Sequence, residues 1–487
     1  MEQETLVPEE LPPLLVDLLG PYLARQRWYG GGEGMPDPVR VIESGCLAEL
    51  GGPSRRLLWA IVGAQDTDYQ VVIAERPVGE VAEHLKGHED ALIGNVGESA
   101  YYDATIDTEM ALALLRAASG GLQSAERSRP LSAEQSNTSL VYDDRLILKF
   151  FRRLTVGPNP DVEVTSALAS TGFSHIALPL VRWQRNGRDL AFGQQYLAGG
   201  SDGWALALTS LRDFYGSFQA GTEPNPALSG GDFAAEANRL GQMSADMHLA
   251  MAQAFGATPR GLAPGWPAFV SLLESRVSQL GPELAGPAGP MLARLRAVRD
   301  PGPAVRVHGD YHLGQVMRTD SGWFVLDFEG EPSRPLDERQ QPTSVLKDVA
   351  GMLRSLQYAT RFTLGETAIS YPAPLGPLAR AWEDRNRSAF VRGYYEREGI
   401  EDLLPLAPDD SDAVRLAFEV DKALYELAYE AAYRPDWVPI PLSALQRLLS
   451  EPVEELLAGQ RGTYGRGSGA GQGHGTEEGY KRRYDYD

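Results

Sequence analysis

The hydrophobic positions in the first hundred residues fall into short runs, most of them typical of β-strands. A helix-like stretch at residues 11–29 comes first and leads into a glycine-rich turn, GGGEGMPDP. Strand-like apolar runs follow at 39–50, 55–64 and 69–75. Because such short runs bounded by turn residues indicate strands, the pattern predicts a small mixed module over residues 1–105.

The next hundred residues predict a second β-rich unit, over residues 106–203. A helical stretch at 107–119 precedes RLILKFFRRL at 145–154, an apolar run that predicts a strand. Proline and acidic residues early in 159–171 are typical of a helix start. Residues 175–197 predict two strands around an Asn-Gly turn, which is a strong hairpin signal.

From residue 204 onward the apolar positions adopt helical spacing, which predicts a helical lobe over 204–459. Two short strand-like runs interrupt it, in VHGDYHLGQV and WFVLDFEGEP. The last segment, residues 460–487, is Gly-rich and polar, so we expect a disordered tail. A β-rich lobe beside a helical lobe makes the cleft between them the expected ligand site. The predicted helices are 204–219, 233–255, 272–280, 345–363, 379–399 and 413–435.

Composition narrows the class of protein. The 487 residues are 43% hydrophobic and carry a net charge of −21, which argues against a general nucleic-acid binder, since such proteins need a basic surface. With Cys46 as the single cysteine, no intrachain disulfide can form, which fits a reducing compartment. The acidic N-terminus lacks the pattern of a signal peptide, and no apolar run reaches the roughly 18 residues of a membrane span. We expect a cytoplasmic protein without membrane or nucleic-acid partners.

The densest chemistry lies at the ends of the two interrupting runs. Asp310 follows the first apolar run, Asp327 follows the second, and Gln315 lies between them. Two carboxylates and one amide oxygen suit Mg²⁺, which prefers oxygen ligands and keeps some waters and phosphates. Glu329 is a third acid that could share this role. Taken alone, either aspartate could be an ordinary turn residue.

The order of these residues matches the parts that phosphoryl transfer needs. A kinase-type site has an aspartate that accepts the hydroxyl proton, then a metal-binding amide, then a metal-binding aspartate on the next strand. Its phosphate-binding lysine lies upstream on a strand and pairs with an acid on the following helix. Lys149 in RLILKFF fits the lysine, with Glu163 as its expected partner and Asp161 as a rival. The alternative is an edge-strand lysine.

Two further segments are candidates for nucleotide contacts. EQSNTSLVY at 134–142 precedes the lysine strand, and its small polar side chains can turn tightly and offer donors to phosphate. It has no Walker A motif or protein-kinase glycine loop, and a plain polar turn is the alternative. GQQYL at 193–197 is the expected hinge between the lobes, where backbone groups would meet adenine. The candidate residues are Ser136, Asn137, Thr138, Gln195 and Leu197.

Together these motifs resemble the bacterial maltokinases, within the aminoglycoside-phosphotransferase-like branch of the protein-kinase-like superfamily. The resemblance rests on the segments already quoted together with RQRWYGG, GPNPDVEV, VLDFEGEPSRPLDER, LKDVAGMLRSLQYA and LYELAYEAAYRPDWVPIPL, which span about residues 25 to 450 in the family's order. One departure is YGGGEG after Arg27-Trp28, where the family often has a basic residue; this leaves the role of that turn open.

The resemblance implies an α+β, bilobal protein-kinase-like fold with a β-rich N-lobe, a helical C-lobe and an N-terminal cap over residues 1–105. It also implies ATP-dependent, Mg²⁺-dependent phosphorylation of maltose to maltose 1-phosphate, for α-glucan synthesis. Asp310 matches the catalytic base, Gln315 and Asp327 match the metal ligands, and Lys149 matches the phosphate-binding lysine. A complex with trehalose synthase is implied by the family link, and we expect the chain itself to be a monomer.

The acceptor site is expected on the last long helix. Tyr425 and Tyr429 are four residues apart and share a helix face, as do Glu426 and Glu430, so rings and carboxylates could bind a sugar. Alternatively, the tyrosines are core and the glutamates are solvated. His312 could touch the acceptor hydroxyl or support the loop.

Several alternatives stay open at this point. Arg354 and Asp348 could form an internal ion pair outside the site. The same scaffold could phosphorylate glucosamine or an aminoglycoside. A non-catalytic pseudokinase would lack Asp310, Asp327 or Lys149, and all three are present.

Overall fold

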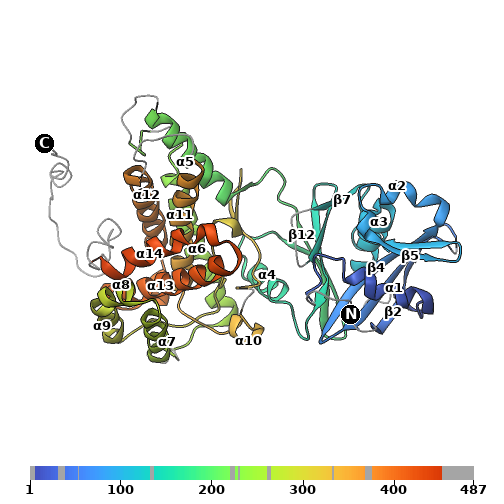
Figure 1. The fold of residues 1–487 in the computed structure, drawn as a ribbon, viewed down its shortest axis with the longest axis horizontal. Helices are drawn as coiled ribbons and strands as arrows, with labels where there is room; N and C mark the ends of the chain where they lie inside the picture. Colours follow the sequence, from blue (N-terminus) through green and yellow to red (C-terminus); the bar gives the residue numbers. More distant parts are fainter. Residues whose placement is uncertain are drawn as a thin grey trace.

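The computed structural model describes residues 6–30, 39–52, 54–131, 137–219, 225–228, 231–259, 265–331, 334–367 and 376–451. Figure 1 shows the N-terminal cap at one end of an elongated molecule, the helical C-lobe at the other and the N-lobe sheet between them. The expected α+β, bilobal, kinase-like architecture with an added cap is confirmed. The expected tail at 460–487 lies outside the described residues.

The cap is built on an antiparallel sheet with the strand order β1-β2-β3-β4-β6-β5. Its long strands carry uninterrupted apolar runs because both faces are covered, one of them by α1 and Trp28. The strands are β1 (Val7–Pro8), β2 (Arg40–Glu49), β3 (Arg56–Ala64), β4 (Thr67–Pro77), β5 (Leu92–Val96) and β6 (Ser99–Asp103), and the helices are α1 (Pro13–Leu23), α2 (Ala82–Leu85) and α3 (Thr108–Ala118).

The N-lobe is a five-stranded antiparallel sheet with the order β11-β12-β9-β8-β7. The expected hairpin forms, with Asn186 and Gly187 at φ +49° and +73°, the left-handed backbone that a tight two-residue hairpin turn requires. The elements are β7 (Ser128–Leu131), β8 (Asn137–Tyr142), β9 (Leu146–Phe151), β10 (Arg153–Leu154), α4 (Pro160–Thr171), β11 (Pro179–Arg185) and β12 (Arg188–Gln195).

The cap and the N-lobe share both backbone pairing and a core. Strand β10 leaves β9 and pairs with β4 of the cap sheet. Trp59 of the cap packs against Trp183 of the N-lobe with ring centroids 5.9 Å apart. Gln70, fully buried, donates from Nε2 to the carbonyls of Phe151 and Leu190, both at 2.8 Å. Residues on both sides of the expected boundary at residue 105 therefore pack into a shared core. The limits of the domains stay a prediction.

The C-lobe packs long helices around one large hydrophobic cluster. Helices α6 and α12 approach closely because Gly241 has no side chain to meet the carbonyl of Phe390. The helices are α5 (Gly203–Gln219), α6 (Ala234–Phe255), α7 (Trp266–Ser278), α8 (Pro282–Ala285), α9 (Gly289–Ala297), α10 (Leu336–Arg339), α11 (Leu346–Thr367), α12 (Gly376–Tyr395), α13 (Pro408–Tyr433) and α14 (Pro439–Ser450).

A three-stranded sheet of the C-lobe contains the residues that follow the Asp310 loop and the apolar run before Asp327. Its strands are β13 (Ser201–Asp202), β14 (Val316–Thr319) and β15 (Gly322–Val325). The apolar run before Asp310 forms no regular strand; Val305 makes only isolated bridges, to Ala257 and Thr343.

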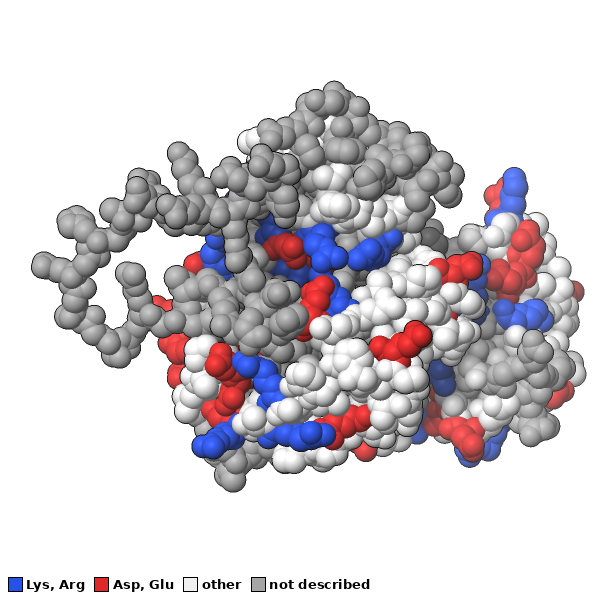
Figure 2. All heavy atoms as spheres, turned by 60° about the vertical axis from the view of Figure 1, so that its left-hand side comes forward, with Lys and Arg blue, Asp and Glu red and all other residues white. Residues whose placement is uncertain are grey.

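On the face shown in Figure 2, acidic and basic side chains lie intermixed, without one large patch of a single sign. None of the helices in the described part of the chain combines the length and the apolar composition that a bilayer crossing needs.

Candidate active site

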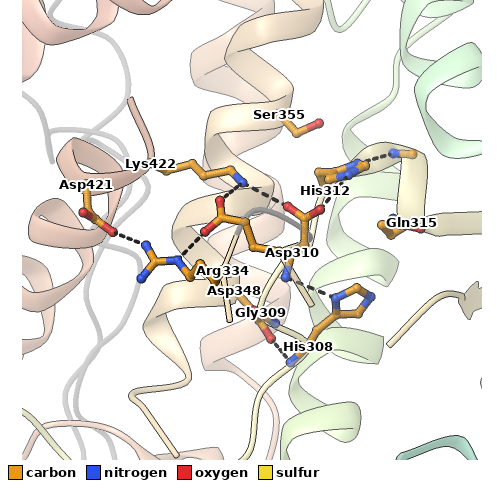
Figure 3. Close-up of polar contacts among 12 residues, drawn as sticks. His308, Gly309, Asp310, His312, Gln315, Arg334, Asp348, Ser355, Asp421 and Lys422 are labelled. Carbon is orange, nitrogen blue, oxygen red and sulfur yellow. Dashed lines mark hydrogen bonds and ion pairs between the residues drawn. The ribbon is translucent and has the colours of Figure 1, made fainter. Parts of the chain in front are cut away.

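The loop that carries Asp310 is fixed by one buried carboxylate. Asp348, at the start of α11, accepts hydrogen bonds from the backbone N–H groups of His308 at 2.7 Å and Gly309 at 2.9 Å (Figure 3). It also lies 3.1 Å from Nε2 of His248. Burial alone would raise the pKa of Asp348, but these partners hold it below its usual value. The carboxylate is thus kept ionised where it clamps the loop.

Asp310 projects from this loop between a lysine and a histidine. Its Oδ1 lies 2.9 Å from the ammonium of Lys422, and its Oδ2 lies 3.8 Å from Nε2 of His312. Burial would raise the pKa of Asp310, but the charge of Lys422, assisted by the histidines, lowers it to about 2. The carboxylate is therefore an anion at neutral pH and can accept a proton or a hydrogen bond.

Gln315 and Asp327 lie together, as a shared metal site requires. The amide Nε2 of Gln315 donates to Oδ2 of Asp327 at 3.3 Å. Asp327 has φ +61°, an uncommon backbone for a residue other than glycine, and such strain often marks functional sites. Burial would raise its pKa, but Lys149 holds it lower. The paired side chains meet the need of Mg²⁺ for oxygen ligands.

The set of donors favours a cation that brings other ligands with it. No group of three or more His, Cys, Asp and Glu side chains in the described ranges forms a complete metal cage. Because Mg²⁺ usually takes one or two carboxylates and completes its shell with waters and phosphates, Gln315 and Asp327 fit a nucleotide-bound Mg²⁺ and not a permanent structural metal.

Lys149 lies above this pair at the interface of the two lobes. Its Nζ lies 2.8 Å from Glu329, 3.4 Å from Asp327 and 3.6 Å from Asp161. The expected partner, Glu163, is wrong: its carboxylate lies 3.5 Å from Arg306 instead. Residues two apart on a helix point to nearly opposite sides, so only one of the two acids can face the strand.

Contacts on both sides hold Asp161 in its place beside Lys149. Asn159 caps the helix by accepting from the N–H of Asp161 at 2.9 Å, which fixes the first turn. The Oδ1 of Asp161 accepts the backbone N–H of Phe328 at 3.1 Å, next to Asp327. Burial raises the pKa of Asp161 to about 6 against the opposing pull of Lys149. The rival named from the sequence therefore replaces Glu163.

The expected phosphate-binding residues are placed in part. Asn137 and Thr138 are the first residues of β8 and not turn residues, and the hydroxyl of Thr138 accepts from Nε of Arg152 at 2.8 Å. Ser136 lies outside the described residues. At the hinge, the N–H of Gln195 already donates to the carbonyl of Leu178, so it is engaged within the sheet. Leu197 lies beyond β12, in the connection to the C-lobe.

A cavity of about 740 Å³ opens beside Asp310 in the C-lobe. It holds four of the expected acceptor residues from α13, together with His312. Ser355 and Lys422 also reach it, from α11 and α13. Its aromatic lining is Trp204, Tyr358, Tyr425, Tyr429 and Trp437, and its acidic lining is Asp310, Glu426 and Glu430.

The glutamates of this cavity are paired and not solvated. Glu426 forms an ion pair with Arg354, whose side chain is fully buried. Glu430 accepts from the hydroxyl of Tyr358 at 2.6 Å and lies 3.0 Å from Arg434. The ion pair between Arg354 and Asp348 that the sequence left open does not form, because Asp348 holds the backbone of His308 and Gly309 instead.

Two family models match the chain in the same order as this architecture. The maltokinase N-terminal cap domain matches residues 22–107, and the phosphotransferase enzyme family matches residues 127–330. The second match contains Lys149, Asp310, Gln315 and Asp327. The chain thus carries a maltokinase-type cap domain followed by a phosphotransferase domain.

Relatives of this phosphotransferase carry the name glucosamine kinase. The one from Mycolicibacterium smegmatis is 29% identical over 348 residues, covering 68% of this chain and 81% of the relative. The one from Streptacidiphilus jiangxiensis is 27% identical over 351 residues, covering 67% and 74%. Among solved structures, a crystal form of glucosamine kinase has a TM-score of 0.65 at 23% identity, covering 91% of this chain and 100% of that chain.

A glucosamine kinase solved with glucosamine, ADP and inorganic phosphate has a TM-score of 0.63 at 22% identity, covering 90% of this chain and 99% of that chain. At these identities the structural likeness shows the fold of the phosphotransferase and leaves its acceptor to be argued from its own residues.

Sequence reasoning missed the charged residues that support Asp310 in this phosphotransferase. Lys422 and Glu331 face each other at 3.1 Å, and Arg334 lies 2.5 Å from Glu331. One signal was available: Lys422 lies one helical turn before Glu426, so it shares the face assigned to the acceptor. Glu331 and Arg334 lie in a loop, where spacing carries no such information.

Proposed function

We propose that this chain is an ATP-dependent sugar kinase that phosphorylates maltose to maltose 1-phosphate. The observation that carries the proposal is the cavity of about 740 Å³ that opens on Asp310, with an aromatic wall and paired acids. Its volume falls in the range of about 300–1,000 Å³ typical of small-molecule sites. Aromatic faces offer apolar surface to sugar rings, while paired carboxylates still accept hydrogen bonds from sugar hydroxyls.

The charges of the cavity favour a neutral sugar over an amino sugar. Each of its three acids in the described residues already has a basic partner: Lys422 for Asp310, Arg354 for Glu426 and Arg434 for Glu430. An ammonium group entering this cavity would meet the Lys422 and Arg434 cations without gaining an uncompensated carboxylate. Desolvating such a charge without a dedicated partner is costly.

In the proposed reaction, the oxygen of the acceptor hydroxyl bonds to the γ-phosphorus of ATP, and the bond from that phosphorus to ADP breaks. Asp310 accepts the proton that the hydroxyl loses. Lys149, supported by Asp161, binds the nucleotide phosphates. Gln315 and Asp327 would hold Mg²⁺, which supplies charge neutralisation at the phosphates when bound. Phosphoryl transfer needs mainly positioning and electrostatic stabilisation, and this set of residues offers both.

The proposal extends to the cellular context. Maltose 1-phosphate would feed α-glucan (glycogen) synthesis in the cytoplasm, and trehalose synthase would be the partner that supplies maltose. Support for this context comes from the match of residues 22–107 to the maltokinase cap domain.

Glucosamine is the second candidate acceptor, because the relatives named glucosamine kinase cover two thirds of this chain. An acceptor screen separates the two. Purified protein with Mg²⁺ and ATP is given maltose, glucose, glucosamine or an aminoglycoside, and the phosphorylated product is identified by mass spectrometry and by phosphorus NMR. We expect maltose 1-phosphate as the main product. Phosphorylated glucosamine without any product from maltose would replace the first acceptor with the second.

A further inference from the structure

Lys422 on α13 joins the catalytic loop to the acceptor cavity. Its Nζ lies 2.9 Å from Oδ1 of Asp310 and 3.1 Å from Oε1 of Glu331, and it lies 4.8 Å from the centroid of the Tyr425 ring. The side chain is 22% exposed, and the exposed part lines the acceptor cavity. A flexible lysine is thus held by two carboxylates and an aromatic face at once.

Glu331, the second carboxylate that holds Lys422, has a basic partner of its own. Glu331 lies 2.5 Å from Nε of Arg334. Arg334 in turn lies 3.6 Å from Asp421, which neighbours Lys422 on α13 (Figure 3). Asp421 also forms an ion pair with Arg276 of α7. The charges alternate in sign from Asp310 to Arg276, so each ion holds the next in place.

This arrangement treats the two oxygens of Asp310 differently. Oδ1 is occupied by Lys422, while Oδ2 faces His312 at 3.8 Å, beyond hydrogen-bond distance. Both His312 and Asp310 line the acceptor cavity. The free side of the carboxylate is therefore the side where an acceptor hydroxyl can arrive.

We propose that Lys422 is a positioning residue, which fixes Oδ1 of Asp310 so that Oδ2 is the oxygen presented to the acceptor hydroxyl. The proposal rests on the proposed role of Asp310 as the base. A base held this way is weak, but the transition state of phosphoryl transfer is loose and demands alignment more than basicity. Lys422 also keeps the carboxylate ionised, so the base stays available below neutral pH.

The titration of Asp310 depends on several neighbours. Lys422 faces it from α13, and His308 and His312 face it from its own loop. Behind it, the small cavity that Asp310 shares with Lys422 is also lined by the charged groups Glu331, Arg334, Lys347, Asp348 and Asp421. Removing Lys422 deletes the largest opposing charge, so the pKa of Asp310 rises towards the value that its burial favours.

The test compares Lys422→Met with Lys422→Arg, which keeps the charge. For Lys422→Met we expect kcat with maltose to fall about 100-fold, as for a misplaced catalytic group. The KM for ATP stays unchanged, and the acid limb of the kcat/KM profile moves to higher pH. Lys422→Arg restores most of kcat and the wild-type acid limb. Lys422→Gln is the second uncharged variant if the methionine variant does not fold.

The matched control is Arg415→Met, which removes a buried cation from the same helix, where it pairs with Glu419 away from the cavity. Arg415→Met should lower stability in urea without moving the pH profile. A wild-type kcat and acid limb in folded Lys422→Met overturn the proposal, as does the same limb shift in Arg415→Met. Asp310→Asn, measured alongside, separates the two ideas: activity in that variant contradicts the proposed base itself, whatever Lys422 does.

Discussion

Lys149 on β9 and Asp161 on α4 lie 3.6 Å apart where the N-lobe meets the segment around Asp327. The same Asp161 accepts the N–H of Phe328, so one buried carboxylate joins the lysine strand, helix α4 and the segment after Asp327. In this chain the strand–helix ion pair therefore also fixes the segment that follows Asp327.

Asp161→Asn should lower kcat with maltose by about 10- to 100-fold, because Lys149 loses the charge that orients it. The matched variant Glu163→Gln should stay within about twofold of wild type, since Glu163 makes only a partly exposed ion pair with Arg306. Steady-state kinetics with ATP and maltose varied in turn measure both. A larger loss in Glu163→Gln than in Asp161→Asn would restore Glu163 as the functional partner.

Asp327→Asn should raise the Mg²⁺ concentration needed for half-maximal activity by at least about tenfold, because an amide is a weaker ligand than a carboxylate for a hard cation. Asp320→Asn, in the exposed turn between β14 and β15, is the control and should leave the Mg²⁺ dependence as it is. The measurement is initial rate against Mg²⁺ at saturating ATP. An unchanged dependence in Asp327→Asn would contradict its role as a metal ligand.

Tyr429→Ala should raise the KM for maltose about fivefold and leave the KM for ATP unchanged, since a lost aromatic face is worth about 1 kcal/mol. Tyr433→Ala is the comparison: this ring lies one turn further on α13, packs at a tilt against Tyr429 and is 73% exposed. We expect a smaller effect from it. Equal changes in both variants, or a change in the KM for ATP, would show a general effect on the helix.

Asp348→Asn should destabilise the fold by about 3–5 kcal/mol at neutral pH, because it removes a buried charge that holds His248 and the catalytic loop. The pKa of Asp348 in the fold is below its usual value. Its stabilisation is thus complete above the unfolded pKa of about 4 and is lost as the pH falls towards the folded pKa.

Urea denaturation of wild type and Asp348→Asn at pH 7 and near pH 4 checks this dependence. The difference in the free energy of unfolding between the two proteins should be smaller at the lower pH. The reason is that the stabilisation by the ionised Asp348 in the wild type begins to be lost there. A constant gap would mean that the lost hydrogen-bond geometry, and not the charge, causes the destabilisation.

Much of this architecture could be predicted from periodicity. The hairpin at 175–197 was readable because Asn186 and Gly187 are the residues that a two-residue turn selects. The apolar spacing also predicted the long helices, including α13. The four predicted acceptor residues of α13 line one cavity. The order of Lys149, Asp310, Gln315 and Asp327 along the chain predicted a phosphoryl-transfer site.

The remaining features depended on contacts that spacing does not encode. Asp161 and Glu163 are equally plausible in sequence, and only the rotation of α4 against β9 selects between them. Spacing within one helix allows a pair between Arg354 and Asp348, but Arg354 pairs with Glu426 of α13 instead. Lys422 meets Asp310 across 112 residues of sequence, and such a contact appears only when α13 packs beside the catalytic loop.

The pairing of β10 with β4 makes the cap and the lobe that carries Lys149 parts of one folded unit. A chain cut at residue 106 would lose the strand that β10 pairs with and would expose Trp183 where Trp59 now covers it. Chimaeras that exchange the cap between related enzymes should therefore succeed only when the partners of Trp59 and Gln70 are exchanged with it. The cap therefore folds against its lobe and would not behave as an interchangeable module.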